Sequence, residues 1–185
     1  MAITRAHATH MIISKELLAS LNEQVGNEFG AMLQYFAIAA HFERETLPML
    51  AGHYHRQAEE EKAHALKIIA FIIDVGGHVE IPALPAPQAK FQFAEEAVKL
   101  ALEHEQKVSK QINNLVAMAK DARDYTTDTF LQWFVQEQLE EVSSMEDLLS
   151  IVQRAGEDNL LRVEEYLARE GGSGSGFRSS NSKED

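Results

Sequence analysis

The sequence contains no cysteine, only four prolines and no long uncharged apolar run. The lack of cysteine excludes disulfides, thiolate metal ligands and cysteine nucleophiles. No segment approaches the roughly 20 consecutive apolar residues that a membrane-spanning helix needs, and the N-terminus lacks the apolar region of a secretory signal. We therefore expect a cytoplasmic protein without a membrane partner.

Positive charge is also scarce. The chain has 17 lysine and arginine residues against 29 aspartate and glutamate residues, which gives a net charge of −12. Such a surface repels phosphate backbones, so we expect no nucleic acid partner. It attracts cations, including metal ions. With 45% hydrophobic residues, the 185-residue chain can form one domain with a sizeable core.

Helix-forming residues dominate the long stretches between the prolines, and apolar residues recur there at spacings of three and four. This pattern predicts an all-α protein with Ser14 as the first N-cap. The predicted helices cover residues 14–43, 48–75, 93–120, 125–155 and 158–169. Residues 1–13 are predicted to form an N-terminal arm, and the Gly/Ser-rich residues 171–185 a flexible tail.

The segment between the second and third predicted helices, "GGHVEIPALPAPQAKFQ", is proline-rich and extended. Its roughly 17 residues can span at most about 55 Å, which exceeds the roughly 45 Å length of each long helix. The sequence therefore predicts a four-helix bundle with one long crossover. The short fifth helix has an apolar side for which a filled core leaves no room, so we expect that side to contact another subunit. Its residues are Leu160, Leu161, Val163 and Leu167.

Each long helix carries polar residues in the middle of an otherwise apolar stripe. The stripe positions are Glu28, Glu61 with His64, Glu105, and Gln138 with Glu141. All lie near the midpoints of their helices, and midpoints of antiparallel helices share one level. The sequence therefore predicts that at least four carboxylates and one imidazole meet in one layer of the core.

Burying several unpaired carboxylates together costs several kcal/mol each, by order of magnitude, and a bound cation removes that cost. Oxygen ligands with one imidazole suit iron, manganese or zinc. Di-iron bundles use single glutamates from two helices and Glu-x-x-His from the other two. Here Glu28 and Glu105 are the single glutamates, Glu61 and His64 form one Glu-x-x-His, and the fourth helix has Gln138-x-x-Glu141 instead.

Over residues 14–170 the chain resembles a bacterial non-haem ferritin of the ferritin-like di-iron family. The segments that carry the resemblance are "NEFGAMLQY", "QAEEEKAH", "HEQKV" and "LQWFVQEQLEEV". The resemblance implies a ferritin-like four-helix bundle, iron storage and detoxification, and a ferroxidase that oxidises Fe(II) with O2 or H2O2. It also implies a hollow homo-oligomer of 24 subunits in which the fifth helix lines the fourfold axes. Bacterioferritins carry a haem-binding methionine where this chain has Lys62, so no haem is expected.

The resemblance further implies roles for individual residues. Glu28, Glu61 and His64 would hold the first iron, with Glu61 bridging to the second. Glu105 would complete the second iron site, with Gln138 close by. Tyr35 matches a tyrosine beside the centre that could donate an electron. A third, inner iron site is implied at four further acids: Glu60, Glu137, Glu140 and Glu141.

Two other functions fit the same pattern. One is a di-metal oxidase or peroxidase of rubrerythrin or manganese-catalase type, which acts on a substrate without storing iron. The other is a helical interaction protein without enzymatic activity, in which the buried Glu and His residues form a salt-bridge network. Oligomeric size and metal content distinguish these functions from iron storage.

Overall fold

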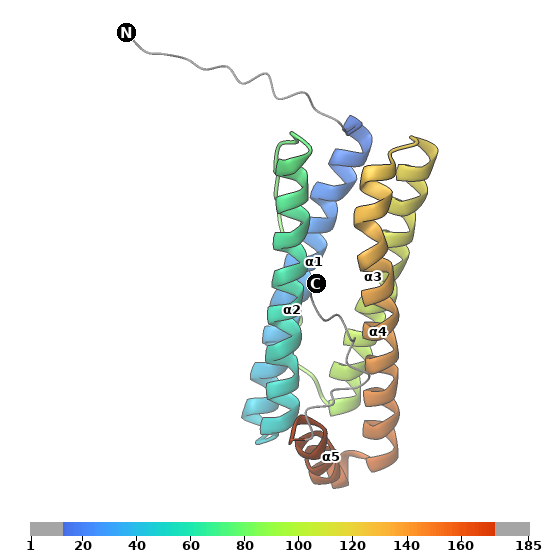
Figure 1. The fold of residues 1–185 in the computed structure, drawn as a ribbon. Coiled ribbons are helices and arrows are strands. Elements are labelled where there is room, and N and C mark those ends of the chain that lie inside the picture. The colour runs from blue at the N-terminus through green and yellow to red at the C-terminus, as the bar shows by residue number, and fades with distance from the viewer. Residues whose placement is uncertain (1–12, 173–185) are drawn as a thin grey trace.

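The computed structural model describes residues 13–172. Within them it contains five α-helices, one short 3-10 helix and no strand (Figure 1). The elements are α1 (Lys15–Arg44), α2 (Pro48–Asp74), α3 (Ala94–Asp121), α4 (Tyr125–Ala155), η1 (Glu157–Asn159) and α5 (Leu160–Gly172). The prediction of an all-α bundle with a short fifth helix is confirmed. The predicted N-terminal arm lies outside the described residues, apart from residue 13. The predicted tail also lies outside them from residue 173 on, whereas residues 171 and 172 belong to α5.

The helix ends follow from local sequence. The Ser14 hydroxyl accepts a hydrogen bond from the Leu17 amide at 3.2 Å and caps α1. The Asp124 carboxylate does the same for α4 through the Thr127 amide at 3.0 Å. Gly156 follows α4 with a φ of 70°, a left-handed conformation that glycine adopts without strain and that ends the helix.

The crossover between α2 and α3 runs along α1 and is fixed there by two side-chain amides. Asn22 donates to the His78 carbonyl at 3.0 Å and accepts from the Glu80 amide at 2.8 Å. Further along α1, Gln34 donates to the Gln88 carbonyl at 2.9 Å and accepts from the Gln88 amide at 2.8 Å. Each of the two side-chain amides pairs with one carbonyl and one N–H group of the crossover backbone. These hydrogen bonds hold the crossover on one path along α1.

The core consists of two apolar clusters, one in each half of the bundle. One is built around Leu21, Ile72 and Phe134 and the other around Phe42, Tyr54 and Leu148, all at most 2% exposed. The polar layer lies between them. Apolar side chains thus hold all four helices in place immediately above and below that layer.

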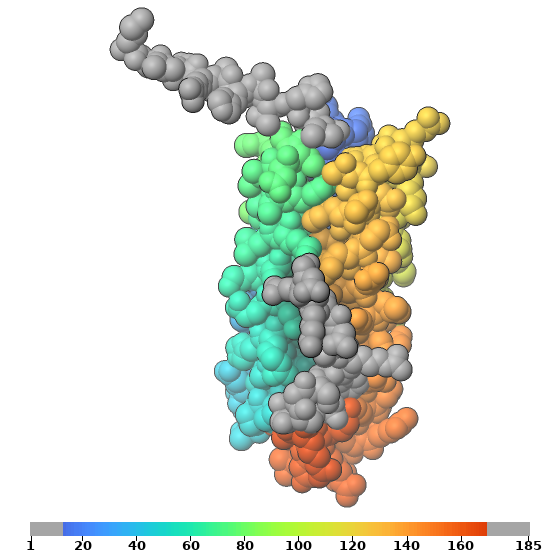
Figure 2. Space-filling model, in the orientation of Figure 1, coloured from blue at the N-terminus to red at the C-terminus, as the bar shows by residue number. Residues whose placement is uncertain are grey.

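The fifth helix packs on its own subunit, which corrects the expectation for its apolar side. Val163 and Leu167 are buried in the same cluster as Phe42, and Leu160 packs against that cluster. Only Leu161 is strongly exposed, at 72%. In Figure 2, α5 closes one end of the bundle beneath α2 and α4. The helix fits into the space at the open end of the bundle. The sequence alone does not show that this space exists.

None of the helices over residues 13–172 combines the length and apolar character needed to span a membrane.

Candidate metal centre

The polar residues predicted at mid-stripe meet in one buried layer, to which each long helix contributes. Their exposed fractions are 7% or less, and Glu28 and Glu105 are fully buried. The layer comprises Glu28 from α1, Glu61 and His64 from α2, Glu105 from α3, and Gln138 and Glu141 from α4. The helical spacing therefore brings together all six side chains that the sequence places at half height.

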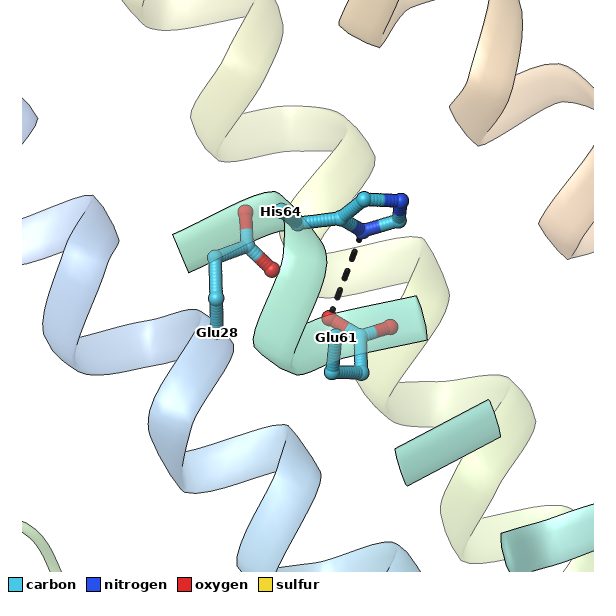
Figure 3. Close-up of side chains that lie close together, drawn as sticks. All are labelled: Glu28, Glu61 and His64. Carbon is cyan, nitrogen blue, oxygen red and sulfur yellow. Dashed lines mark ion pairs between the residues drawn. The ribbon is translucent and has the colours of Figure 1, made fainter. Parts of the chain in front are cut away.

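Glu28, Glu61 and His64 form the tightest group. Each offers a ligand atom, and these atoms lie within 4.8 Å of one another. In Figure 3 the Glu28 carboxylate extends from α1 toward the two side chains of α2. The His64 Nδ1 atom lies 3.6 Å from Glu61 Oε2. Two carboxylates and an imidazole at these separations can bind one divalent metal ion.

The atoms that face one another in this group lack hydrogen bonds. Glu28 Oε2, Glu61 Oε2 and His64 Nδ1 are buried without a partner among the described residues. The other Glu28 oxygen accepts a hydrogen bond from the Gln24 side-chain amide at 2.9 Å. Unsatisfied buried polar atoms are costly and rare in native proteins, so three of them pointing at one place indicate a ligand.

Glu105 and its partners form the second half of the centre. The Tyr35 hydroxyl donates a hydrogen bond to one Glu105 oxygen. Gln138 Nε2 donates to the other at 3.3 Å, and Gln138 Oε1 accepts from the Ser109 hydroxyl at 2.9 Å. These contacts fix the Glu105 carboxylate in the layer and connect Tyr35 directly to the candidate metal ligands.

Electrostatics show that the layer disfavours its own negative charge. Burial raises the pKa of Glu28, and it raises the pKa of Glu61 well above the ordinary range, with the nearby Glu105 charge adding to the effect. Burial also raises the pKa of Glu105 to about 7, against the opposing hydrogen bond from Tyr35. Without a cation these groups keep their protons to higher pH than exposed carboxyl groups do, and a metal ion would displace those protons.

His64 is neutral at physiological pH. Burial, with a smaller effect from the Lys67 ammonium, lowers the pKa of its imidazole to about 4. Its contact with Glu61 is therefore not a pair of opposite charges, although the two side chains lie at ion-pair distance. The ring packs edge-on against Trp133 and Phe134, with centroid separations of 5.4 and 5.9 Å. A neutral imidazole held in this way is ready to bind a metal.

A second group lies beside the first. His64, Glu137 and Glu141 also offer ligand atoms within 4.8 Å of one another. Of the four acids predicted for the third site, this group contains Glu137 and Glu141, while Glu60 and Glu140 are exposed. Burial raises the pKa of Glu137, and the charges of Glu140 and Glu60 raise it further. All four acids therefore share one electrostatic environment next to the buried layer.

Sequence reasoning missed the supporting residues. Gln24 and Ser109 hold Glu28 and Gln138, and Gln57 donates to Glu60. Gln24 lies one helical turn before Glu28 and could have been identified from that spacing. Ser109 lies four residues after Glu105, but its partner is on α4, so no local signal identifies it.

The fold and the buried layer define a class: four-helix bundle proteins with a carboxylate-rich metal centre at half height. The family model for the ferritin-like domain matches residues 18–155. Ferritin BfrB of Mycobacterium tuberculosis is 43% identical over 152 residues, covering 82% of this chain and 83% of that protein. The bacterial non-heme ferritin of Staphylococcus epidermidis is 39% identical over 147 residues, covering 80% and 89%.

A solved structure gives the same result. The open pore ferritin from the archaeon Archaeoglobus fulgidus superposes with a TM-score of 0.82 at 33% identity, covering 84% of this chain and 96% of that one. The chain therefore belongs to the ferritin family.

Proposed function

We propose that this protein stores and detoxifies iron: it oxidises Fe(II) to Fe(III) with O2 at the buried centre and keeps the product as mineral inside an oligomeric shell. The observation that carries the proposal is the group formed by Glu28, Glu61 and His64, whose unpartnered ligand atoms converge in the core of a ferritin-family bundle. Iron is the substrate, and the side chains are its binding site.

Each ligand has a distinct role in this proposal. Glu28 and His64 hold the first Fe(II), and Glu61 lies between the two metal positions and bridges them. Glu105 holds the second Fe(II). Gln138 positions the Glu105 carboxylate through its hydrogen bond of 3.3 Å. The charges of both Glu28 and Glu105 raise the pKa of Glu61, and this closeness to both carboxylates supports its role as the bridge.

The chemistry requires two iron ions close together. Two Fe(II) ions each lose one electron, and one O2 takes up both electrons with two protons to give H2O2. Carboxylate oxygens favour Fe(III) over Fe(II), so the ligand set makes the oxidation more favourable. Where reduction continues from H2O2 to water, which takes two more electrons and two more protons, Tyr35, hydrogen-bonded to Glu105, would supply one of those electrons. The protons released from the carboxyl groups when iron binds are available for oxygen reduction.

The acids beside the centre provide a path for iron to leave. Glu137 and Glu141 share His64 with the first group. Glu60 and Glu140 extend the acidic surface outward and, with these two, form the third site of the proposal. Iron would pass from the buried centre through this site to the mineral.

The proposal also includes a homo-oligomeric shell of 24 subunits, a cytoplasmic location and no haem. Lys62 supports the last point. It occupies the position of a haem-binding methionine, and its ammonium donates to Glu59 at 2.8 Å on an exposed face.

Aerobic addition of Fe(II) tests the proposal. We expect O2 uptake in proportion to iron oxidised, and iron that remains with the protein through size-exclusion chromatography in a particle much larger than one subunit. No O2 uptake and no retained iron would exclude the function. Oxidation by a compact monomer or dimer that retains no iron would instead favour a di-metal oxidase.

A further inference from the structure

A groove of about 490 Å³ runs between α3 and α4, which lie side by side (Figure 1). Ile112, Val135, Leu139 and Val142 give it an apolar lining. The other lining residues are neutral polar side chains and one lysine, Lys110, with no aspartate or glutamate among them. In a chain with net charge −12, a groove without acids is unusual and does not attract metal cations.

The groove reaches the metal centre through a single side chain. Ser109 and Gln138 both line it. The Ser109 hydroxyl donates to Gln138 Oε1 at 2.9 Å, and on its other side Gln138 Nε2 donates to Glu105 Oε2 at 3.3 Å. The Gln138 amide is therefore a partition between the groove and the Glu105 carboxylate. Its two hydrogen bonds are of ordinary length and contribute only modestly to stability, so rotation of this side chain is accessible.

The face of α4 turned away from the groove is acidic. There Glu137 and Glu141 approach His64 from α2, and Glu60 and Glu140 add charge. A cation would approach and leave on this acidic side. A small apolar molecule gains nothing from it but is favoured by an apolar groove over water.

We propose that the groove between α3 and α4 is the route by which O2 reaches the centre, with Gln138 as the gate and Ser109 as the residue that positions it. This inference rests on the proposed ferroxidase function. The route keeps the oxidant apart from the iron path: O2 arrives between α3 and α4, and iron moves between α2 and α4.

Two lysines on α3 allow a matched test. Lys110 lines the groove, whereas Lys107 is exposed and does not line it. In Lys110→Trp an indole covers the groove, and in Lys107→Trp the same change of size and charge is made outside it. The assembled protein is loaded with Fe(II) without oxygen and mixed with buffers of graded O2 concentration, and the oxidation rate is followed by absorbance.

We expect Lys110→Trp to raise the O2 concentration at half-maximal rate by about threefold or more while retaining the limiting rate at high O2. Lys107→Trp should match the wild type in both quantities. An unchanged O2 dependence in Lys110→Trp, or the same change in both variants, overturns the route. If the wild type oxidises no iron, the ferroxidase proposal itself has failed, which is a different result.

A second pair tests the gate. Ser109→Leu and Ser109→Ala both remove the hydroxyl that holds Gln138, but only leucine fills the floor of the groove. We expect the O2 requirement to rise in Ser109→Leu, because leucine blocks the groove, and to fall in Ser109→Ala, because the released Gln138 side chain opens more readily. If the O2 requirement rose equally in both variants, the cause would be the lost hydrogen bond, and the groove would not be the route for O2. Co(II) binding, measured by its absorption spectrum, verifies that each variant retains its metal centre.

Discussion

At the scale of single residues, Glu61 is the most informative position, because it is 1% exposed and surrounded by other carboxyl groups. Glu61 must take up a proton to be buried at neutral pH, and Glu61→Gln removes that requirement. The metal-free variant should therefore gain about 1–3 kcal/mol of stability while losing tight Co(II) binding. Thermal unfolding and a Co(II) titration measure the two effects. Glu59→Gln is the matched control, since Glu59 is exposed and its ion pair is with the exposed Lys62. A destabilised Glu61→Gln that binds Co(II) normally would contradict the account.

The pKa of Glu105 gives a pH dependence with a definite sign. The folded protein holds this proton up to about pH 7, whereas the usual pKa is 4.5. The folded state therefore binds more protons between these values, and the metal-free protein should become less stable as the pH rises from 4.5 to 7. Glu105→Gln does not titrate and should lose less stability over this range, by about 3 kcal/mol.

Urea unfolding at several pH values measures this difference. His64, whose folded pKa is lowered, acts in the opposite direction in both proteins and cancels from the comparison. Parallel stability profiles for the wild type and Glu105→Gln would show that burial does not hold the Glu105 proton.

The sequence predicted the site residues that recur at helical spacing within one helix. It did not predict the contacts between side chains of different helices. Glu28, Glu61, His64 and Glu105 stand out because each interrupts an apolar stripe, and the structure brings them together. That His64 also belongs to the group of Glu137 and Glu141 depends on how α2 and α4 are rotated against each other. No sequence pattern encodes that rotation.

At the scale of elements, two glycines of α1 provide a matched test of how the crossover packs. A Cβ atom on Gly26 would lie 2.3 Å from Pro82 Cγ, whereas one on Gly30 would have no neighbour within 4 Å. Gly26→Ala should therefore destabilise the protein by about 1–3 kcal/mol through overpacking. Gly30→Ala should stabilise it by about 0.5–1 kcal/mol because alanine favours helix. Urea unfolding measures both. Equal effects would show that the crossover does not press on α1.

The fifth helix also caps α2. The Glu164 carboxylate accepts hydrogen bonds from the Met49 amide at 2.7 Å and the Leu50 amide at 2.8 Å, where α2 has no local side-chain cap. Glu164→Ala should destabilise the protein by about 1–2 kcal/mol. Glu165→Ala, at an exposed neighbouring position, should have little effect. Thermal unfolding of the two variants makes the comparison, and equal melting temperatures would exclude the cap.

Helix periodicity was sufficient to predict the bundle, because apolar stripes, proline positions and the long link leave few alternative topologies. The docking of α5 was not predictable. Its apolar residues indicate that one side must be covered, but only the open space at the end of the bundle determines that Val163 and Leu167 are covered by their own subunit. Likewise Glu164 caps a helix more than a hundred residues away in sequence, which local rules do not detect.

At the scale of the whole molecule, the bundle is organised around its charge. The two apolar clusters hold the four helices on either side of the polar layer, so its carboxyl groups are unable to move apart into solvent. A surface with net charge −12 draws cations toward the protein. The molecule thus combines a negatively charged exterior with a carboxylate-rich interior, which we expect to gain stability when a metal ion binds.

Crystals soaked in Fe(II) without oxygen, with anomalous maps recorded at the iron absorption edge, test the central claim most directly. The account predicts two peaks inside each bundle: one among Glu28, Glu61 and His64, and one between Glu61 and Glu105. Maps without iron inside the bundle, while these side chains keep their buried positions, would contradict it.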